Sequence, residues 1–182
     1  MLIEGAILRD VQVGRFPAGE LLGPGDLLRP WQRDEGYASV PASTTWTALS
    51  EARFAVLDRD YMKATAPWPE LAASLVCRAV DRSRSTAFSF ALTNLPLLEQ
   101  RLLGLLWALA DRWGRVRSDG VLVPFRLDHE VLSRLVSARR PSVSRTAVHL
   151  AERGHLRRTP ERHWVLTSDP PTLALPSLRA GQ

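Results

Sequence analysis

The chain has 182 residues, of which 45% are hydrophobic, and it carries a formal net charge of +5 at pH 7. A chain of this length can bury a real core, as one large or two small domains. Its one cysteine, Cys77, excludes an internal disulfide framework, a cysteine-held iron–sulfur cluster and a zinc knuckle. The longest apolar run, Leu102–Ala110 apart from Gly104, is too short to cross a bilayer, and no signal sequence opens the chain. We expect a cytoplasmic protein without membrane contact.

The positive charge is unevenly distributed. Residues 97–168 hold 13 arginines, no lysine and 7 acidic residues, a net charge of +6. Residues 1–65 hold 7 basic and 9 acidic residues, a net charge of −2. Such asymmetry is expected of a nucleic-acid-binding surface, but an arginine-rich solvated face from a GC-rich genome fits it equally well.

Residues 2–60 have the pattern of short strands separated by turns. We expect the strands to be broken at Gly5, at Gly14 and at the Pro17–Gly19 segment. We expect Gly23–Asp26 to form a turn. The predicted strands are Leu2–Ile3, Ala6–Leu8, Val11–Val13, Leu21–Leu22 and Leu27–Leu28, followed by a hairpin of Thr44–Leu49 and Ala52–Leu57.

Residues 69–94 lack turn residues, which predicts one long helix. Two neighbouring apolar stripes run along it: Leu71, Leu75 and Ala79, and Val76, Val80, Ala87 and Phe90. The pattern suits a helix that packs on a partner and on its own domain, and an ordinary core helix fits it equally well. The polar face, with Arg78, Arg82 and Arg84, is expected to be solvated. Pro96 then breaks the chain and predicts a hinge.

A second helix is predicted over Leu97–Trp113, because leucines recur along it and Gly114 ends it. Val116 and Val121–Phe125, separated by an Asp119-Gly120 turn, predict a small hairpin. The stretch after Ser168 is proline-rich and unpatterned, so we expect a disordered tail.

The stretch between this hairpin and the tail predicts two short helices joined by a tight turn at Ser137–Ala138. Asp128 is a good N-cap for the first helix. The second begins near Arg139, with Pro141 in its first turn, where a missing N–H costs nothing. Its buried stripe is Val143, Ala147 and Leu150, its opposite face carries Arg140, Ser144, Arg145 and His149, and Gly154 ends it.

Two strands follow the second helix, His155–Arg158 and His163–Thr167, joined by a turn at Thr159–Arg162. Two helices, a tight turn and a hairpin make a winged helix-turn-helix, a DNA-binding motif.

The run RRPSVSR, inside LSRLVSARRPSVSRTAVHLAERGHL, resembles the recognition helix of Crp/Fnr-type bacterial transcription regulators. In that family an Arg-x-[Ser/Thr]-Val-x-Arg run places two arginines in the major groove, and Arg140 and Arg145 match them. Pro141 stands where the family often has an acidic residue, so the bases preferred there are expected to differ. Ser137 replaces the usual turn glycine, which predicts a slightly different turn.

The segment ELLGPGDLLRPW resembles the later strands of the cyclic-nucleotide-binding β-roll of the same family. The resemblance implies a roll that lacks its first strands. Leu28–Trp31 stands where nucleotide-binding members have a Gly-Glu pair, and Tyr37–Pro41 offers no arginine at the matching place. A cyclic phosphate needs a positive partner and free N–H groups, and Pro30 removes one N–H. We expect no cyclic AMP binding and no cofactor.

These observations together predict an α+β fold of four parts. A partial cyclic-nucleotide-binding-like β-roll spans residues 1–66, a long dimerisation helix 67–95, a winged helix-turn-helix 96–168 and a disordered tail 169–182. The resemblance implies a sequence-specific transcription regulator that binds double-stranded DNA as a homodimer on a palindromic operator. Contact with RNA polymerase is a further expectation.

The expected DNA-binding residues lie on the second helix and the wing: Arg139, Arg140, Pro141, Ser142, Ser144, Arg145, His149, Arg157, Arg158 and Arg162. Arg140 is expected to read a guanine, and Arg145 a neighbouring base or phosphate. The wing arginines are expected to contact only the DNA backbone.

No catalytic motif stands beside these residues. The sequence has no GxSxG elbow, Walker loop or HExxH helix, and its histidines, at 129, 149, 155 and 163, lack the spacing of metal ligands. We therefore expect neither a metal site nor an enzyme. Two alternatives stay open: a small-molecule sensor with its ligand between the partial roll and the long helix, and a winged-helix protein-interaction module.

Overall fold

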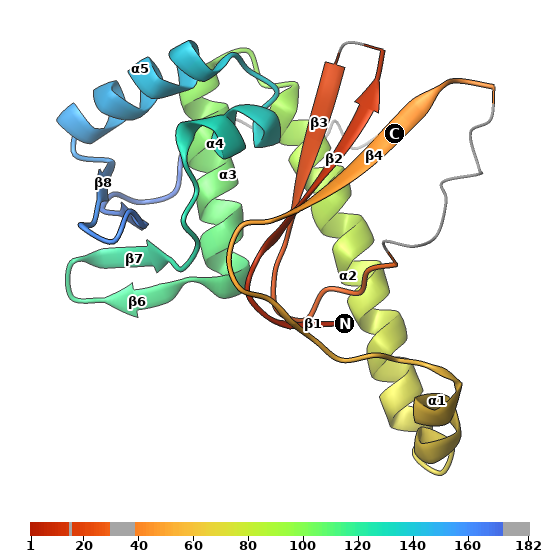
Figure 1. Cartoon of the computed structure of the whole chain (residues 1–182). Helices are drawn as coiled ribbons and strands as arrows, with labels where there is room; N and C mark the ends of the chain where they lie inside the picture. Colours follow the sequence, from red (N-terminus) through yellow and green to blue (C-terminus); the bar gives the residue numbers. More distant parts are fainter. Residues whose placement is uncertain (15, 30–38, 173–182) are drawn as a thin grey trace, which may run out of the picture.

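The computed structural model describes residues 1–14, 16–29 and 39–172, and it has the expected α+β fold (Figure 1). The loop residues Pro30, Trp31 and Tyr37 and the predicted tail beyond Thr172 lie outside the described residues. The elements are β1 (Leu2–Glu4), β2 (Ile7–Val13), β3 (Phe16–Leu22), β4 (Ala42–Ala48), β5 (Arg53–Phe54), α1 (Arg59–Thr65), α2 (Pro69–Thr93), α3 (Leu98–Trp113), β6 (Arg115–Arg117), β7 (Gly120–Val123), α4 (His129–Leu135), α5 (Arg140–Glu152), β8 (Leu156–Arg158) and β9 (Trp164–Leu166).

The N-terminal strands form a three-stranded antiparallel sheet of order β3-β2-β4 and a separate pair, β1-β5. The predicted hairpin of Thr44–Leu49 with Ala52–Leu57 is therefore wrong. β4 pairs with β2, and β5 pairs with β1. The chain changes partner at the corner formed by Gly5, whose φ is +91° and where a Cβ would lie 2.3 Å from the Glu51 carbonyl oxygen. Because Gly5 has no side chain, the segment around Glu51 can pass close to it, and β5 then pairs with β1.

The break predicted at Pro17–Gly19 is also wrong, because both residues lie within β3. β3 is an edge strand of its sheet, and an edge tolerates proline because one side of the strand needs no ladder hydrogen bond. Gly19 has a packing role: a Cβ there would lie 3.1 Å from Cβ of Arg134 on α4. The glycine lets α4 approach the sheet closely.

The long helix predicted over residues 69–94 is confirmed as α2. It runs past the sheet to α1 (Figure 1), and its only buried residue is Leu92. The expectation that Arg82 is solvated is wrong: its side chain is 21% exposed and donates to the Glu20 carboxylate on β3 and to the Leu27 carbonyl. Arg84 is 79% exposed, as expected. None of the described helices is both long and apolar enough to span a membrane.

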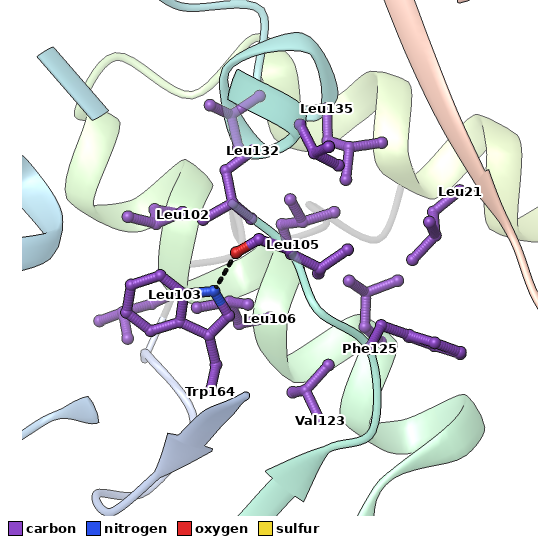
Figure 2. Packing of buried hydrophobic residues seen from close by; sticks show 14 of the residues in the cluster. Leu21, Leu102, Leu103, Leu105, Leu106, Val123, Phe125, Leu132, Leu135 and Trp164 are labelled. Carbon is purple, nitrogen blue, oxygen red and sulfur yellow. Dashed lines mark hydrogen bonds between the residues drawn. The ribbon is translucent and has the colours of Figure 1, made fainter. Parts of the chain in front are cut away.

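One large hydrophobic cluster joins the sheet to the C-terminal half of the chain, and Leu2, Ile7 and Leu22 form a second, smaller one. Leu102 and Leu106 of α3 are fully buried at the centre of the large cluster, and Figure 2 shows side chains of α4, β7 and β9 packed around this helix. Leu8 and Leu21, from β2 and β3, belong to the same cluster. The indole Nε1 of Trp164 donates to the Leu127 carbonyl at 2.7 Å (Figure 2). The sheet and the two helices that follow β7 therefore share one interior.

Two arginine–carboxylate pairs reinforce this junction. Asp10 on β2 is 5% exposed, and its Oδ2 lies 2.6 Å from Nη1 of Arg134 on α4. Asp26 is 2% exposed, and its Oδ1 lies 2.6 Å from Nη2 of Arg112 on α3. Each buried carboxylate would be costly without its charged partner. The pairs therefore fix where α3 and α4 sit on the sheet.

The Asp10–Arg134 pair should contribute measurably to stability. Arg134→Met leaves the Asp10 carboxylate buried without its partner, so the free energy of unfolding in urea should fall by about 1–3 kcal/mol. The matched control is Arg84→Met, which removes a pair with Asp81 whose side chains are 79% and 69% exposed. That control should change stability by less than about 0.5 kcal/mol at the same protein concentration. Equal, small losses in both variants would show that the junction does not depend on Arg134.

Candidate nucleic-acid interface

The first helix of the predicted motif, α4, begins as its sequence indicates. The Asp128 side chain caps it by accepting a hydrogen bond from the Val131 amide at 2.8 Å. Leu132 and Leu135 turn inward to the core on α3. The cap and the buried face together fix the orientation of α4.

The turn between the two helices is made at Ser137, which has a φ of +51°. This is the left-handed region that glycine adopts at no steric cost and that costs another residue about 1–2 kcal/mol. Ala138 N–H donates to the Ser133 carbonyl at 2.9 Å and closes the turn. Serine thus takes the backbone conformation that a glycine would favour at this position.

The second helix, α5, follows the predicted pattern closely. Arg139 is its N-cap, and Pro141 lies in its first turn. The predicted stripe is confirmed, because the buried residues of α5 are Val143, Ala147 and Leu150. Gly154, with a φ of +72°, lies just after the helix. The buried stripe leaves the other side of α5 facing outward.

The first half of that outward side presents guanidinium groups. Arg139, Arg140 and Arg145 are exposed, as is Pro141, while Ser142 and Ser144 are half-buried. Within the described part of the chain, none of these three arginines forms an ion pair. Arg140 and Arg145 are five residues apart, which places them roughly 140° apart around the helix at 3.6 residues per turn. They present donors in two directions.

His149, four residues after Arg145 on α5, is exposed and has a partner on α3. Its Nε2 is 3.5 Å from Oε1 of Glu99 at the start of α3, and Nη1 of Arg153 is 3.2 Å from the other oxygen of that carboxylate. The end of α5 is thus tied to α3. His149 therefore has a carboxylate partner, whereas Arg140 and Arg145 form no ion pair among the described residues.

The wing is a four-stranded antiparallel sheet of order β6-β7-β9-β8, in which the predicted strands on both sides of the Thr159–Arg162 turn are confirmed. Its three arginines differ. Arg157 donates to Asp119 at the β6–β7 turn. Arg158 lies over the ring of Trp164, with its Cζ 4.9 Å from the ring centroid. Arg162 is exposed, with a φ of +68°. Adjacent strand residues point to opposite faces, so Arg157 and Arg158 face different sides.

The structure adds a residue that the sequence did not single out. His129, the first residue of α4, has its ring centroid 5.9 Å from that of Trp164. Burial lowers the pKa of His129, the charges of Arg158 and Arg140 lower it further, and Asp128 opposes them. Residues from α4, β8 and β9 thus meet at the ring of Trp164. No local sequence signal could have shown this, because the meeting depends on the positions of three separate elements.

The described residues contain no group of three or more histidine, cysteine, aspartate or glutamate side chains that could hold a metal ion. A pocket of about 390 Å³ lies elsewhere, between α3, the end of α5 and residues 168–172. Its walls include Glu99, Leu103, Arg153 and His155.

Comparison with known proteins gives a consistent result. A family model described as the Crp-like helix-turn-helix domain matches residues 100–175. The chain is 28% identical over 178 residues to a CRP-like cAMP-activated global transcriptional regulator of Mycobacterium tuberculosis, with 90% of this chain and 74% of that protein covered. The same match is found in the CDC 1551 and H37Rv strains of that organism.

Solved structures share the fold at low sequence identity. A CRP-family transcriptional regulator from Thermus thermophilus superposes with a TM-score of 0.62 at 19% identity, covering 92% of this chain and 81% of that one. A cyclic nucleotide-binding domain containing protein from Listeria monocytogenes superposes with a TM-score of 0.67 at 15% identity, covering 92% and 78%.

The motif built by α4, α5 and the wing is thus a Crp-like helix-turn-helix domain. The chain as a whole is a homologue of Crp-family transcription regulators. The predicted fold class is confirmed, and the predicted resemblance to Crp-type regulators is supported by the matching domain model and the Mycobacterium relative.

Proposed function

We propose that this protein binds DNA as a homodimer and reads a palindromic operator with α5. The observation that carries the proposal is the exposed, unpaired set of Arg139, Arg140 and Arg145 on a Crp-like helix-turn-helix, within the residues that the structure describes. In helix-turn-helix docking, the N-terminal residues of the second helix contact base edges. Guanidinium groups placed there match the acceptors of guanine and the phosphates beside it.

The roles within this set follow from position. Arg140, at the first position of α5, is placed to donate to O6 and N7 of a guanine. Arg145 points elsewhere around the helix and therefore reaches a neighbouring base or a flanking phosphate. The hydroxyls of Ser142 and Ser144 can donate to phosphate. In the wing, Arg162 is exposed and available to a phosphate, whereas Arg157 is engaged by Asp119.

A homodimer through α2 is supported by the apolar seam that this helix exposes. Val76, Val80, Ser83, Ala87 and Phe90 recur at alternating spacings of four and three, the pattern of a two-stranded coiled coil. Val76 is 63% and Phe90 71% exposed. The face with Arg82 is occupied by the sheet of the same protomer, so the seam is left for a partner. The second chain would place two copies of α5 in successive major grooves.

We further propose that DNA binding does not require cyclic AMP, although the Mycobacterium relative is named as cAMP-activated. Where β3 meets α2, the Glu20 carboxylate accepts hydrogen bonds from Arg82 and Thr86 and lies 3.3 Å from Arg9. Burial alone would raise the pKa of Glu20, but these hydrogen bonds and the charge of Arg82 outweigh it and lower the pKa. Glu20 is thus ionised at neutral pH, and an anionic cyclic phosphate brought here would meet a carboxylate.

The remaining parts of the proposal follow from a DNA-binding role. The protein would act in the cytoplasm and alter transcription through RNA polymerase, without catalysis of its own. The sensor alternative places a ligand between the roll and the long helix. The 390 Å³ pocket does not support it, because that pocket lies between α3 and α5.

Arg140 and Arg162 should affect DNA binding in different ways. Arg140→Ala should weaken binding to the preferred duplex by about 1–3 kcal/mol and relax the preference at one G·C pair in each half-site. Arg162→Ala should weaken all sequences about equally and reduce the salt dependence by roughly one counterion per protomer. Selection from a random DNA library followed by binding titrations at several salt concentrations measures both effects. Unchanged selection by Arg140→Ala would mean that α5 does not read the bases as proposed.

Disruption of the α2 seam should abolish the dimer. Val80 is 44% exposed on the seam, so Val80→Glu would place two carboxylates at an apolar contact and give monomers in light scattering. The control is Val116→Glu, which adds the same charge at an 87% exposed valine on β6 and should leave the dimer intact. If the unaltered protein is already monomeric at micromolar concentration, the seam is not a dimer interface.

Cyclic nucleotides should not bind. Calorimetry with cyclic AMP and with cyclic GMP should give no saturable heat, because the Gly-Glu pair and arginine of nucleotide-binding relatives have no counterparts at the matching places. Saturable binding of either nucleotide at micromolar concentration would contradict this part of the proposal.

A further inference from the structure

Two basic side chains from two elements lie against the same indole ring beside the first turn of α4. They are His129 of α4 and Arg158 of β8, and the charge of Arg140 on α5 is close enough to lower the pKa of His129. The ring is that of Trp164: its centroid is 5.9 Å from that of His129 and 4.9 Å from Cζ of Arg158. Trp164 is itself 3% exposed and fixed by its hydrogen bond to the Leu127 carbonyl. The buried Trp164 ring therefore holds the cluster of His129 and Arg158 in a fixed position.

The charges around this cluster are not balanced by hydrogen-bonded carboxylates within the described part of the chain. Asp128 is close enough to favour the charged forms of His129 and Arg158, but its Oδ1 is used to cap α4. Glu130 is paired with Arg134. Nε of Arg158 is buried and has no hydrogen-bond partner among the residues that the structure describes. Like charges gathered in this way favour an external anion.

The ionisation of both groups reflects this surplus of positive charge. Burial lowers the pKa of His129, and Arg158 and Arg140 lower it further. Burial also lowers the pKa of Arg158, and the nearby charge of Arg162 adds to the effect. Without DNA, His129 is therefore largely neutral at neutral pH, since its pKa lies below the ordinary 6.5.

We propose that His129 and Arg158, beside Arg140, bind one phosphate of the DNA backbone, and that His129 takes up a proton when the phosphate binds. The inference rests on the proposed DNA-binding function and extends it to a contact from the first helix and to control by pH. α5 would contact the bases while His129 and Arg158 bind the adjoining DNA backbone. This phosphate contact would fix the register of α5 in the groove.

The proton linkage has a definite direction. A phosphate beside His129 stabilises the imidazolium, so the pKa of His129 is higher in the complex than in the free protein. The complex then holds more protons than the free protein at any pH between these two values. Affinity for DNA must rise as pH falls through the pKa of the complex and level off below the pKa of the free protein. A difference of one pKa unit corresponds to about tenfold in affinity for each protomer.

The test is the dissociation constant of the full chain for a random-sequence duplex, since a phosphate contact does not require the operator. Between about pH 8 and about pH 6, the unaltered protein should bind about tenfold more tightly for each pKa unit of difference. His129→Gln should bind weakly with little change with pH. His129→Lys, which stays charged, should bind tightly across the range. Melting temperatures establish that both variants are folded.

His155→Gln is the matched control, because Nδ1 of His155 lies 3.0 Å from the Ser168 hydroxyl and the residue takes no part in the cluster. It should keep the full pH dependence. A His129→Gln variant that also keeps it would overturn the inference, as would binding by the unaltered protein that does not change with pH. In both cases the proposed function would stand. Absence of DNA binding at every pH would overturn the proposed function and the inference with it.

Discussion

The packing of α3 against α4, α5 and the N-terminal sheet is the constraint on which the rest of this structure depends. Leu102 and Leu106 are fully removed from solvent at its centre, and burial of side chains of this size contributes about 1.5–3 kcal/mol each. Because α4 packs on β3, and α5 packs on both α3 and α4, the orientation of α5 follows from these contacts. A change in the core would therefore move the surface proposed to meet DNA.

The chain uses its arginines in two ways. Arg112 and Arg134 are bound to buried carboxylates and hold the sheet to the helices. Arg139, Arg140 and Arg145 are exposed and carry no ion pair in the part of the chain that the structure describes. The net charge of the C-terminal half does not separate these roles. The proposal of DNA binding rests on the second set, because only unpaired guanidinium groups are available to phosphates and bases without a prior cost.

The sequence predicted what local patterns determine. The stripe of Val143, Ala147 and Leu150 follows from helical period, and the cap at Asp128 from its side-chain chemistry. The resemblance of RRPSVSR to a recognition helix was likewise local. The wrong predictions were the break at Pro17–Gly19, which lies within the edge strand β3, and those that depend on contacts between distant segments.

The partners of β4 and β5 depend on a close approach at Gly5 that no alternation pattern contains. Arg82 lies on a polar face of α2 that the sequence predicts to be solvated. It pairs with Glu20 instead, because α2 crosses the sheet at that point. The role proposed for His129 depends on Arg158 and Trp164, which are distant in sequence.

The central claim, a two-fold protein that places two copies of α5 on DNA, is tested most directly by ethylation interference on a duplex selected by the protein. We expect two matching sets of essential phosphates on one face of the duplex, with centres about one helical turn apart. A single set, or uniform weak interference along the duplex, would contradict the account.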